Sequence, residues 1–189
     1  MSNDGQNPFW RWSLEHYADK RVERMLLRLQ DDIGFDVNVV LWCCWRAQHS
    51  PPLDEAALNE AIEAKREWTA GVVHPLRAAR RYIKIVQPDA NDDISRLRER
   101  IKVAELEAEK HVQNLLFALA PSETARSTQP PEQTALCNLN LYAKLLGVEK
   151  NPAFSKNLLH ELVDNIFETT QNVSGTGLGR RPGEKQDDR

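Results

Sequence analysis

One stretch is more apolar than any other and belongs at the centre of the fold: Gly34-Phe35-Asp36-Val37-Asn38-Val39-Val40-Leu41-Trp42-Cys43-Cys44-Trp45. As a helix from Val37 it has apolar side chains on nearly every side, and such a helix is buried in protein or inserted in a membrane. Its apolar run of about nine residues is well short of the roughly 20 that span a bilayer. We therefore predict a buried central helix over about 37–47.

The residues that begin this helix carry signals of their own. Gly34 suits the left-handed conformation that ends a preceding helix, and Asp36 is a preferred N-cap. Asn38 is the one polar residue near the start, and leaving a buried amide unpaired costs about 1–3 kcal/mol. We expect Asn38 to be buried and bonded to another helix, with Gln30 or Tyr17 as the partner.

Length and composition predict a single all-α domain. The 189 residues include only 8 Gly, and Ala, Leu, Glu and Arg dominate, which favours helices. A chain of this length can bury a full core. The formal net charge of -3 is close to neutral, so it gives no reason to expect binding to nucleic acid or to an acidic membrane.

Capping and turn signals predict one compact bundle of about seven helices. The expected helices span about 9–18, 20–33, 37–47, 55–73, 75–86, 92–119, 132–146 and 156–169. Pro75 either kinks the fourth helix or opens the fifth. We expect one domain over 1–170, with a linker at 121–131 inside it. Residues 171–189 have almost nothing apolar to offset the entropy of ordering, which predicts a disordered C-terminal tail.

The cysteines and the N-terminus predict a cytoplasmic protein. Cys43, Cys44 and Cys137 form no CxxC motif and no metal-ligand spacing, and an odd count with apolar neighbours is typical of reduced, buried thiols. Residues 1–6 lack the basic and then apolar pattern of a signal peptide. We expect no cofactor and no bound metal ion.

The fifth and sixth expected helices carry apolar residues at helical spacing. In 75–86 these residues form a narrow stripe of Leu76, Ala79, Ile83 and Val86. In 92–119 the apolar steps alternate three and four, the rhythm of antiparallel helix packing. The positions are Ile94, Leu97, Ile101, Ala104, Ala108, His111, Leu115 and Ala118. A coiled-coil dimer would also suit this rhythm, but small residues thin its seam, so we expect a monomer or weak homodimer.

The fifth expected helix also carries four positive charges on little more than two turns. They are Arg77, Arg80, Arg81 and Lys84. Like charges four residues apart repel each other unless an anion or carboxylates lie nearby. One alternative is that Arg77 and Arg81 bind phosphate or another anion. The other is that the four cations pair with acidic residues of the next helix. The candidates there are Glu99, Glu105 and Glu109.

Several motifs stand out over most of residues 9–165. They are Phe9-Trp10-x-x-Ser13-Leu14-x-x-Tyr17-Ala18, Leu29-Gln30-Asp31-x-x-Gly34-x-Asp36-Val37-Asn38, Leu41-Trp42-x-x-Trp45 and Trp68-x-x-x-Val72-Val73-x-Pro75-Leu76-Arg77-x-x-Arg80-Arg81. Together they resemble an uncharacterised bacterial family that is catalogued only as a domain of unknown function. The resemblance implies a cytoplasmic protein of proteobacterial type and carries over no activity.

The resemblance directs attention to a set of polar and aromatic residues. They are Ser13, Tyr17, Gln30, Asp31, Asp36, Asn38, Trp68 and Arg77. Several lie on or beside apolar helix faces, and two arrangements suit them. They could converge as a buried hydrogen-bond network that fixes helix register, or they could line a small pocket between helices.

No motif in the chain names a reaction. We predict a non-catalytic cytoplasmic interaction or regulatory protein with an unidentified protein partner. The alternative is a small helical enzyme or ligand-binding protein for a phosphorylated or anionic small molecule. That alternative requires Arg77 or Arg81 to face a cavity. The same cavity must be lined by Asp31, Asp36 or Asn38, whereas an exposed apolar patch favours a protein partner.

Overall fold

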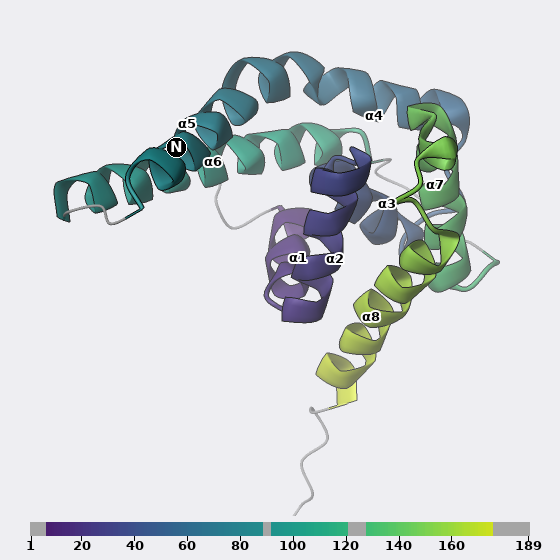
Figure 1. The fold of residues 1–189 in the computed structure, drawn as a ribbon. Helices are drawn as coiled ribbons and strands as arrows, with labels where there is room; N and C mark the ends of the chain where they lie inside the picture. The colour runs from purple at the N-terminus through teal and green to yellow at the C-terminus, as the bar shows by residue number, and fades with distance from the viewer. Residues whose placement is uncertain (1–6, 89–91, 121–127, 176–189) are drawn as a thin grey trace, which may run out of the picture.

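A computed structural model describes residues 7–88, 92–120 and 128–175, and in these ranges the chain forms eight α-helices and no strand (Figure 1). They are α1 (Pro8–Tyr17), α2 (Lys20–Arg28), α3 (Val37–Ala47), α4 (Glu55–Trp68), α5 (His74–Val86), α6 (Asp92–Ala118), α7 (Pro131–Leu146) and α8 (Lys156–Gly175). Two π-helical turns, η1 (Leu29–Ile33) and η2 (Thr69–Val73), continue α2 and α4, and a 3-10 turn, η3 (Val148–Lys150), follows α7. The predicted all-α fold is confirmed.

The central helix α3 is buried along nearly its whole length. All residues from Asn38 to Ala47 are buried, and Trp42 is only 1% exposed. The helix packs most extensively on α7 and also contacts α1, α2 and α6 (Figure 1). This arrangement confirms the predicted buried helix over 37–47, because a helix that is apolar all round needs neighbours on every side.

The start of α3 has the predicted caps. Gly34 ends η1 with a φ of 98°, in the left-handed region. The Asp36 carboxylate accepts hydrogen bonds from the backbone N–H groups of Asn38 and Val39, at 2.9 and 3.4 Å. The backbone N–H of Asp36 in turn donates to the hydroxyl of Tyr142 on α7, at 3.2 Å. The N-terminus of α3 is therefore held between η1 and α7.

The helices α4 and α5 are joined without a break through η2 (Figure 1). Pro75 accounts for the π-helical turn, because it has no N–H and its ring would clash with the carbonyl four residues earlier in a regular α-helix. In η2 the N–H of His74 bonds to the Thr69 carbonyl five residues back, so the chain passes the proline and stays helical. The eight α-helices thus form seven rods, in agreement with the prediction.

The C-terminal helix is longer than predicted. α8 continues to Gly175, whereas we expected it to end near residue 169. The remainder of the expected tail, 176–189, lies outside the described residues. Residues 121–127 of the expected linker and 89–91 between α5 and α6 also lie outside them.

The buried face of α6 differs from the predicted stripe near its C-terminal end. Ala108, Val112 and Leu116 are buried there, whereas His111 and Ala118 are exposed. The reason is a change of neighbour along this 27-residue helix. Its first half packs on α5, and its second half packs on α1 and α3, which lie in a different direction. A single heptad stripe cannot face both.

The thiols agree with the prediction in part. Cys43 and Cys44 are free and buried in α3, and burial raises the pKa of Cys44 to about 12. Cys137 on α7 is free but exposed, so the expectation that all three thiols are buried is wrong. Among the described helices, none combines the length and the apolar character needed to cross a membrane.

Candidate functional site

Most of the charged residues singled out in the sequence meet where α5 packs on α6 and on η1. We call this contact the charged seam. It consists of Gln30, Asp31, Arg77, Arg80, Arg81, Glu105 and Glu109. Both described π-helical turns adjoin it, because η1 carries Gln30 and Asp31 and η2 leads directly into α5. Such turns are rare and often occur at functional sites, so the charged seam is the first candidate for a functional site.

Arg77 is the centre of the charged seam. Its Nε donates to Glu105 Oε1 at 3.0 Å, its Nη1 donates to Gln30 Oε1 at 2.8 Å, and its Nη2 donates to Glu109. The Arg77 side chain is 19% exposed and that of Glu105 is 8% exposed. Each of the three guanidinium nitrogens of Arg77 therefore donates to a partner. Through these bonds Arg77 joins α5 to both α6 and η1.

The other cations of α5 have unequal partners. Arg80 Nη2 donates to Glu105 Oε1 at 3.2 Å, so two arginines share this carboxylate. Arg81 Nη2 reaches Asp31 Oδ1 at 2.9 Å, with both side chains about half exposed. Lys84 forms no ion pair with any residue that the structure describes. Arg77 and Arg80 thus pair with the α6 glutamates that were the candidates, whereas Arg81 pairs with Asp31 of η1. Anion binding at Arg77 and Arg81 stays a prediction that would require displacing these carboxylates.

The two glutamates on Arg77 respond to it differently. Burial raises the pKa of Glu105, but hydrogen bonds from Arg80 and Arg77 outweigh burial and hold this pKa below its ordinary value. For Glu109, burial is stronger than the attraction of Arg77, and the pKa is raised. Burial also raises the pKa of Tyr17 to about 12, with a further contribution from the charge of Glu109. Tyr17 therefore borders the seam and stays a neutral phenol at neutral pH.

Asn38 and Asp36 lie at the start of α3, outside the charged seam. Asn38 is 7% exposed, and its Oδ1 accepts a hydrogen bond from Gln113 Nε2 of α6 at 2.9 Å. The expected burial is confirmed, but the expected partner is wrong, because Gln30 bonds to Arg77 instead. Asp36 caps α3 and pairs with Lys65 Nζ of α4 at 2.6 Å. Both residues join helices, but through partners outside the predicted set, Gln113 and Lys65.

Trp68 and Ser13 complete the set of predicted site residues. Trp68 Nε1 donates to the Ala108 carbonyl of α6 at 3.0 Å, and its ring lies 4.4 Å from that of His111. Ser13 is 3% exposed in α1, and its hydroxyl forms no hydrogen bond with the residues described. Among the predicted site residues, side chain–side chain hydrogen bonds join only Gln30 to Arg77 and Asp31 to Gln30 and Arg81. The side chains of Trp68 and Asn38 bond to residues outside the predicted set, and so does that of Asp36, apart from its cap on the Asn38 N–H.

Sequence analysis missed the outer face of α5. No residue of this helix is fully buried, and Tyr82 and Ile85 are 65% and 76% exposed. We call this face the α5 stripe, which consists of Pro75, Ala78, Ala79, Tyr82, Ile85 and Val86, all exposed. Of the predicted stripe, Leu76 and Ile83 are half-buried, whereas Ala79 and Val86 belong to the outer face. A second apolar series at steps of three and four was the signal that could have found it.

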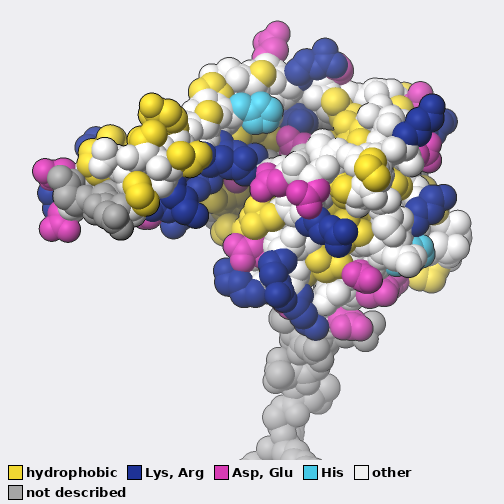
Figure 2. Space-filling view, in the orientation of Figure 1, with side chains coloured by type: hydrophobic (Ala, Val, Ile, Leu, Met, Phe, Trp, Pro, Cys, Tyr) yellow, Lys and Arg dark blue, Asp and Glu magenta, His cyan; other side chains and the backbone are white. Residues whose placement is uncertain are grey.

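The α5 stripe lies on a projecting part of the molecule. The helix α5 and residues 92–106 of α6 run side by side and extend away from the other helices (Figure 1). We call this hairpin the arm. Figure 2 shows hydrophobic side chains gathered on the arm, with Lys and Arg side chains below them. The arm therefore presents an apolar surface at a distance from the core.

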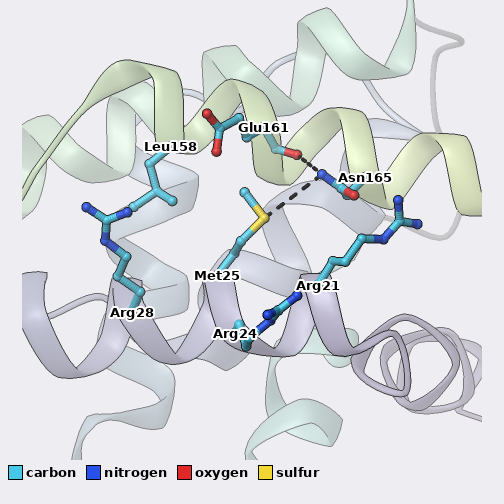
Figure 3. A pocket seen from close by; sticks show the side chains of 7 residues that line it. All are labelled: Arg21, Arg24, Met25, Arg28, Leu158, Glu161 and Asn165. Carbon is cyan, nitrogen blue, oxygen red and sulfur yellow. Dashed lines mark hydrogen bonds between the residues drawn. The ribbon is translucent and has the colours of Figure 1, made fainter.

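A groove lies elsewhere, between α2 and α8 (Figure 3), with a volume of about 420 Å³. Its lining residues are Arg21, Arg24, Met25, Arg28, Leu158, Glu161 and Asn165. Figure 3 shows the arginines along the α2 side and Met25 between the two helices. No predicted site residue lines this groove, so it does not join Arg77 or Arg81 to the other candidates.

One comparison with known proteins gives a result. A family model described as "Protein of unknown function (DUF2390)" matches residues 8–116. This range runs from α1 through most of α6, so it contains the charged seam and the whole arm, and it leaves out α7 and α8. No curated protein and no solved structure matches the chain significantly.

Proposed function

This chain belongs to the DUF2390 family of proteins of unknown function, and we propose that it is a non-catalytic cytoplasmic interaction protein that binds a partner protein through the α5 stripe. One observation carries the proposal: α5 turns a continuous apolar face to solvent for more than two turns. Contiguous exposed apolar surface is rare on soluble monomers and marks interaction sites.

The charged seam supports this proposal from the other side of the helix. Because α5 has no fully buried residue, its ion pairs hold it against α6: Arg77 and Arg80 share the carboxylate of Glu105, and Arg77 also pairs with Glu109. Arg81 and Asp31 add a link to the body. A surface held in place before binding loses less conformational entropy on association. We propose that the seam serves to hold the α5 stripe in one orientation.

Photocrosslinking in the cells that produce the chain tests this proposal. A photoreactive amino acid would replace Ile85 in one variant and Leu14 in another. Leu14 is a matched control, because it is also a large aliphatic side chain at the surface, 46% exposed, but it lies on α1. We expect position 85 to form adducts with a discrete protein that position 14 does not reach. The added substitution Tyr82→Glu should abolish these adducts, and identical adduct patterns from both positions would contradict the proposal.

The groove between α2 and α8 favours the second candidate, a binding protein for an anionic small molecule. Arg24 and Arg28 form no ion pair with any described residue, whereas Arg21 pairs with Asp19. The volume of the groove falls within the usual range for ligand sites. Millimolar diphosphate should then raise the melting temperature of the wild type but not of Arg28→Ala. Loss of the shift in Arg77→Ala alone would assign the anion to the charged seam, and no shift at all would exclude this candidate.

A further inference from the structure

We infer that Arg46 of α3 binds a small oxyanion, a phosphate or a carboxylate group, beside Trp42. This site is separate from the α5 stripe and the charged seam, and Arg46 does not line the groove between α2 and α8. Three observations support it. Arg46 is buried without a counter-charge, a second buried donor lies beside it, and the exposed side chain of His49 lies within reach of its charge.

Arg46 is a buried cation without a partner. The residue is 7% exposed, and its Nε and Nη1 are enclosed and form no hydrogen bond with the residues that the structure describes. Arginine does not lose its proton in proteins, so the charge remains. Arginines are almost never this buried unless they are paired, because burying an uncompensated charge is costly. The guanidinium is therefore suited to an anion from outside the chain.

The groups around Arg46 do not supply a negative charge. Burial lowers the pKa of Arg46, and the Cys43 thiol is the one described group whose charge would oppose this effect. Burial raises the pKa of Cys43 well above its ordinary value, so this thiol is neutral at pH 7. At the end of the helix, the carbonyls of Trp45 and Arg46 already accept from the backbone N–H groups of Gln48 and His49. No described carboxylate therefore acts on Arg46.

Trp42 provides a second donor beside the guanidinium. Side chains of a helix lean toward its N-terminus, and Arg46 accordingly lies over Trp42, one turn back, with its Cζ 5.5 Å from the centre of the ring. The ring attracts the cation but has no lone pair to accept its N–H groups. Trp42 Nε1 is also a buried donor without an acceptor among the described residues. Because an oxyanion has several acceptor oxygens, one such group suits the donors of both side chains.

The site lies near the surface at the end of α3. His49 is exposed there, and after burial the charge of Arg46 is the second cause that lowers the pKa of His49. The guanidinium is thus close to a side chain that solvent reaches. A water molecule at Arg46 would accept from its N–H groups but leave the charge uncompensated. An oxyanion does both, because the planar fork of arginine matches two oxygens of a phosphate or a carboxylate.

Thermal unfolding of the full chain tests the inference. Phosphate or acetate is added to about 10 mM at constant ionic strength, with chloride as the reference anion. We expect at least one of the two oxyanions to raise the wild-type melting temperature by about 3 °C, because it binds only the folded state. The larger rise identifies the preferred group. Arg46→Met should show no rise, and Arg46→Lys, which keeps the charge without the fork, should show a smaller one.

A control variant and a second readout make the test specific to Arg46. Arg28→Ala, in the groove between α2 and α8, should keep the rise with phosphate or acetate. Diphosphate, the probe for that groove, is too bulky to enter beside a residue that is 7% exposed and should not stabilise Arg28→Ala. NMR titration of His49, assigned with His49→Gln, requires no change at Arg46. The bound oxyanion should raise the pKa of His49, because a nearby negative charge favours the protonated ring.

Three results would overturn the inference. An equal rise in the wild type and in Arg46→Met would place the anion elsewhere in the molecule, and a rise lost only in Arg28→Ala would place it in the groove. No rise with either oxyanion, together with an unchanged pKa of His49, would show that water alone accompanies Arg46. If Arg46→Met does not fold, Arg46→Lys and the His49 titration decide. None of these results bears on the α5 stripe, so the proposed function is tested separately.

Discussion

Glu105 and Glu109 bind the same arginine, yet their charges contribute to stability with opposite sign. The pKa of Glu105 is lowered, so its ionised form stabilises the fold above the unfolded pKa, and this contribution is lost as pH falls through the folded pKa. The pKa of Glu109 is raised, so its contribution is present at low pH and is lost as pH rises through the folded pKa. We predict that Glu105→Gln destabilises the protein at pH 7, whereas Glu109→Gln leaves the stability unchanged or higher.

Urea unfolding at pH 7 and again below the ordinary carboxyl pKa measures this difference. At the lower pH both carboxyls are protonated in the unfolded state, so the penalty for Glu105→Gln should shrink. Equal losses for the two variants at pH 7 would show that both carboxylates are stabilised alike. The charged seam would then contain two equivalent ion pairs, instead of one glutamate whose ionised form is stabilised by folding and one whose ionised form is destabilised.

Arg77 and Arg81 offer a second comparison at the residue scale. Arg77→Ala leaves Glu109 without its cation and Glu105 with Arg80 alone, and losing one side of a buried pair costs about 3–5 kcal/mol. The Arg77 side chain is 19% exposed, so we predict a loss of about 3 kcal/mol in urea unfolding. Arg81→Ala removes a pair whose side chains are 50% and 44% exposed and should cost less than about 1 kcal/mol. Similar losses for both would contradict the central role of Arg77.

For single residues, the sequence predicted burial or the need for a bonding partner more often than it predicted which residue the partner is. The repulsion among the α5 cations indicated nearby carboxylates, and two of the three candidates on α6 supply them. Glu99 pairs instead with Lys102 on its own helix. Asn38 was expected to be buried, but its partner Gln113 is 75 residues away in the chain. Side-chain chemistry indicates that a partner is needed, while its identity depends on how the helices cross.

At the element scale, two glycines in open space give opposite predictions. A Cβ at Gly34 or at Gly71 would meet no atom within 4 Å, so packing does not separate them. Gly34 has a φ of 98°, and a side chain in the left-handed region costs about 1–2 kcal/mol. Gly71 lies within helical η2, where alanine is favoured by about 0.5–1 kcal/mol. We therefore predict that Gly34→Ala lowers the melting temperature and Gly71→Ala raises it.

Differential scanning calorimetry of these two variants checks the prediction. Gly34→Asn is a useful third variant, because asparagine tolerates the left-handed conformation better than alanine does. It should therefore fall between the wild type and Gly34→Ala. A rise in melting temperature for Gly34→Ala would mean that this turn does not hold its positive φ in solution.

Helix starts followed from the sequence because they depend on a few adjacent residues. Asn7, Asp19, Asp36 and Asp54 each cap the helix that follows them. The π-helical turns and the two faces of α5 were not predictable in this way. Whether Ile83 or Ile85 faces another helix depends on how η2, which precedes Pro75, rotates the chain that follows it. A π-helical turn shifts every later side chain to another direction, so a regular helical pattern read through 55–86 places the faces of α5 wrongly.

At the scale of the whole molecule, the described residues form two parts, a core and the projecting arm. The core is built on α3, and its largest contact is with α7. On α7, Asn138 donates to the Cys43 carbonyl of α3 at 3.0 Å and accepts from the Leu53 N–H at 2.8 Å. The family match ends at residue 116, before this helix begins. The matched range therefore holds the arm and the charged seam but lacks the helix that covers α3.

This division predicts that residues 7–120 do not fold alone. Without α7 and α8, one side of an all-apolar helix would face water, and Trp42 would lose cover that keeps it 1% exposed. A chain of residues 7–175 keeps every described contact and should melt at the temperature of the full chain. Thermal unfolding followed by circular dichroism compares the three lengths. Cooperative melting of 7–120 would show that α3 finds enough cover among α1, α2 and α6, and that α7 and α8 are additions to a complete domain.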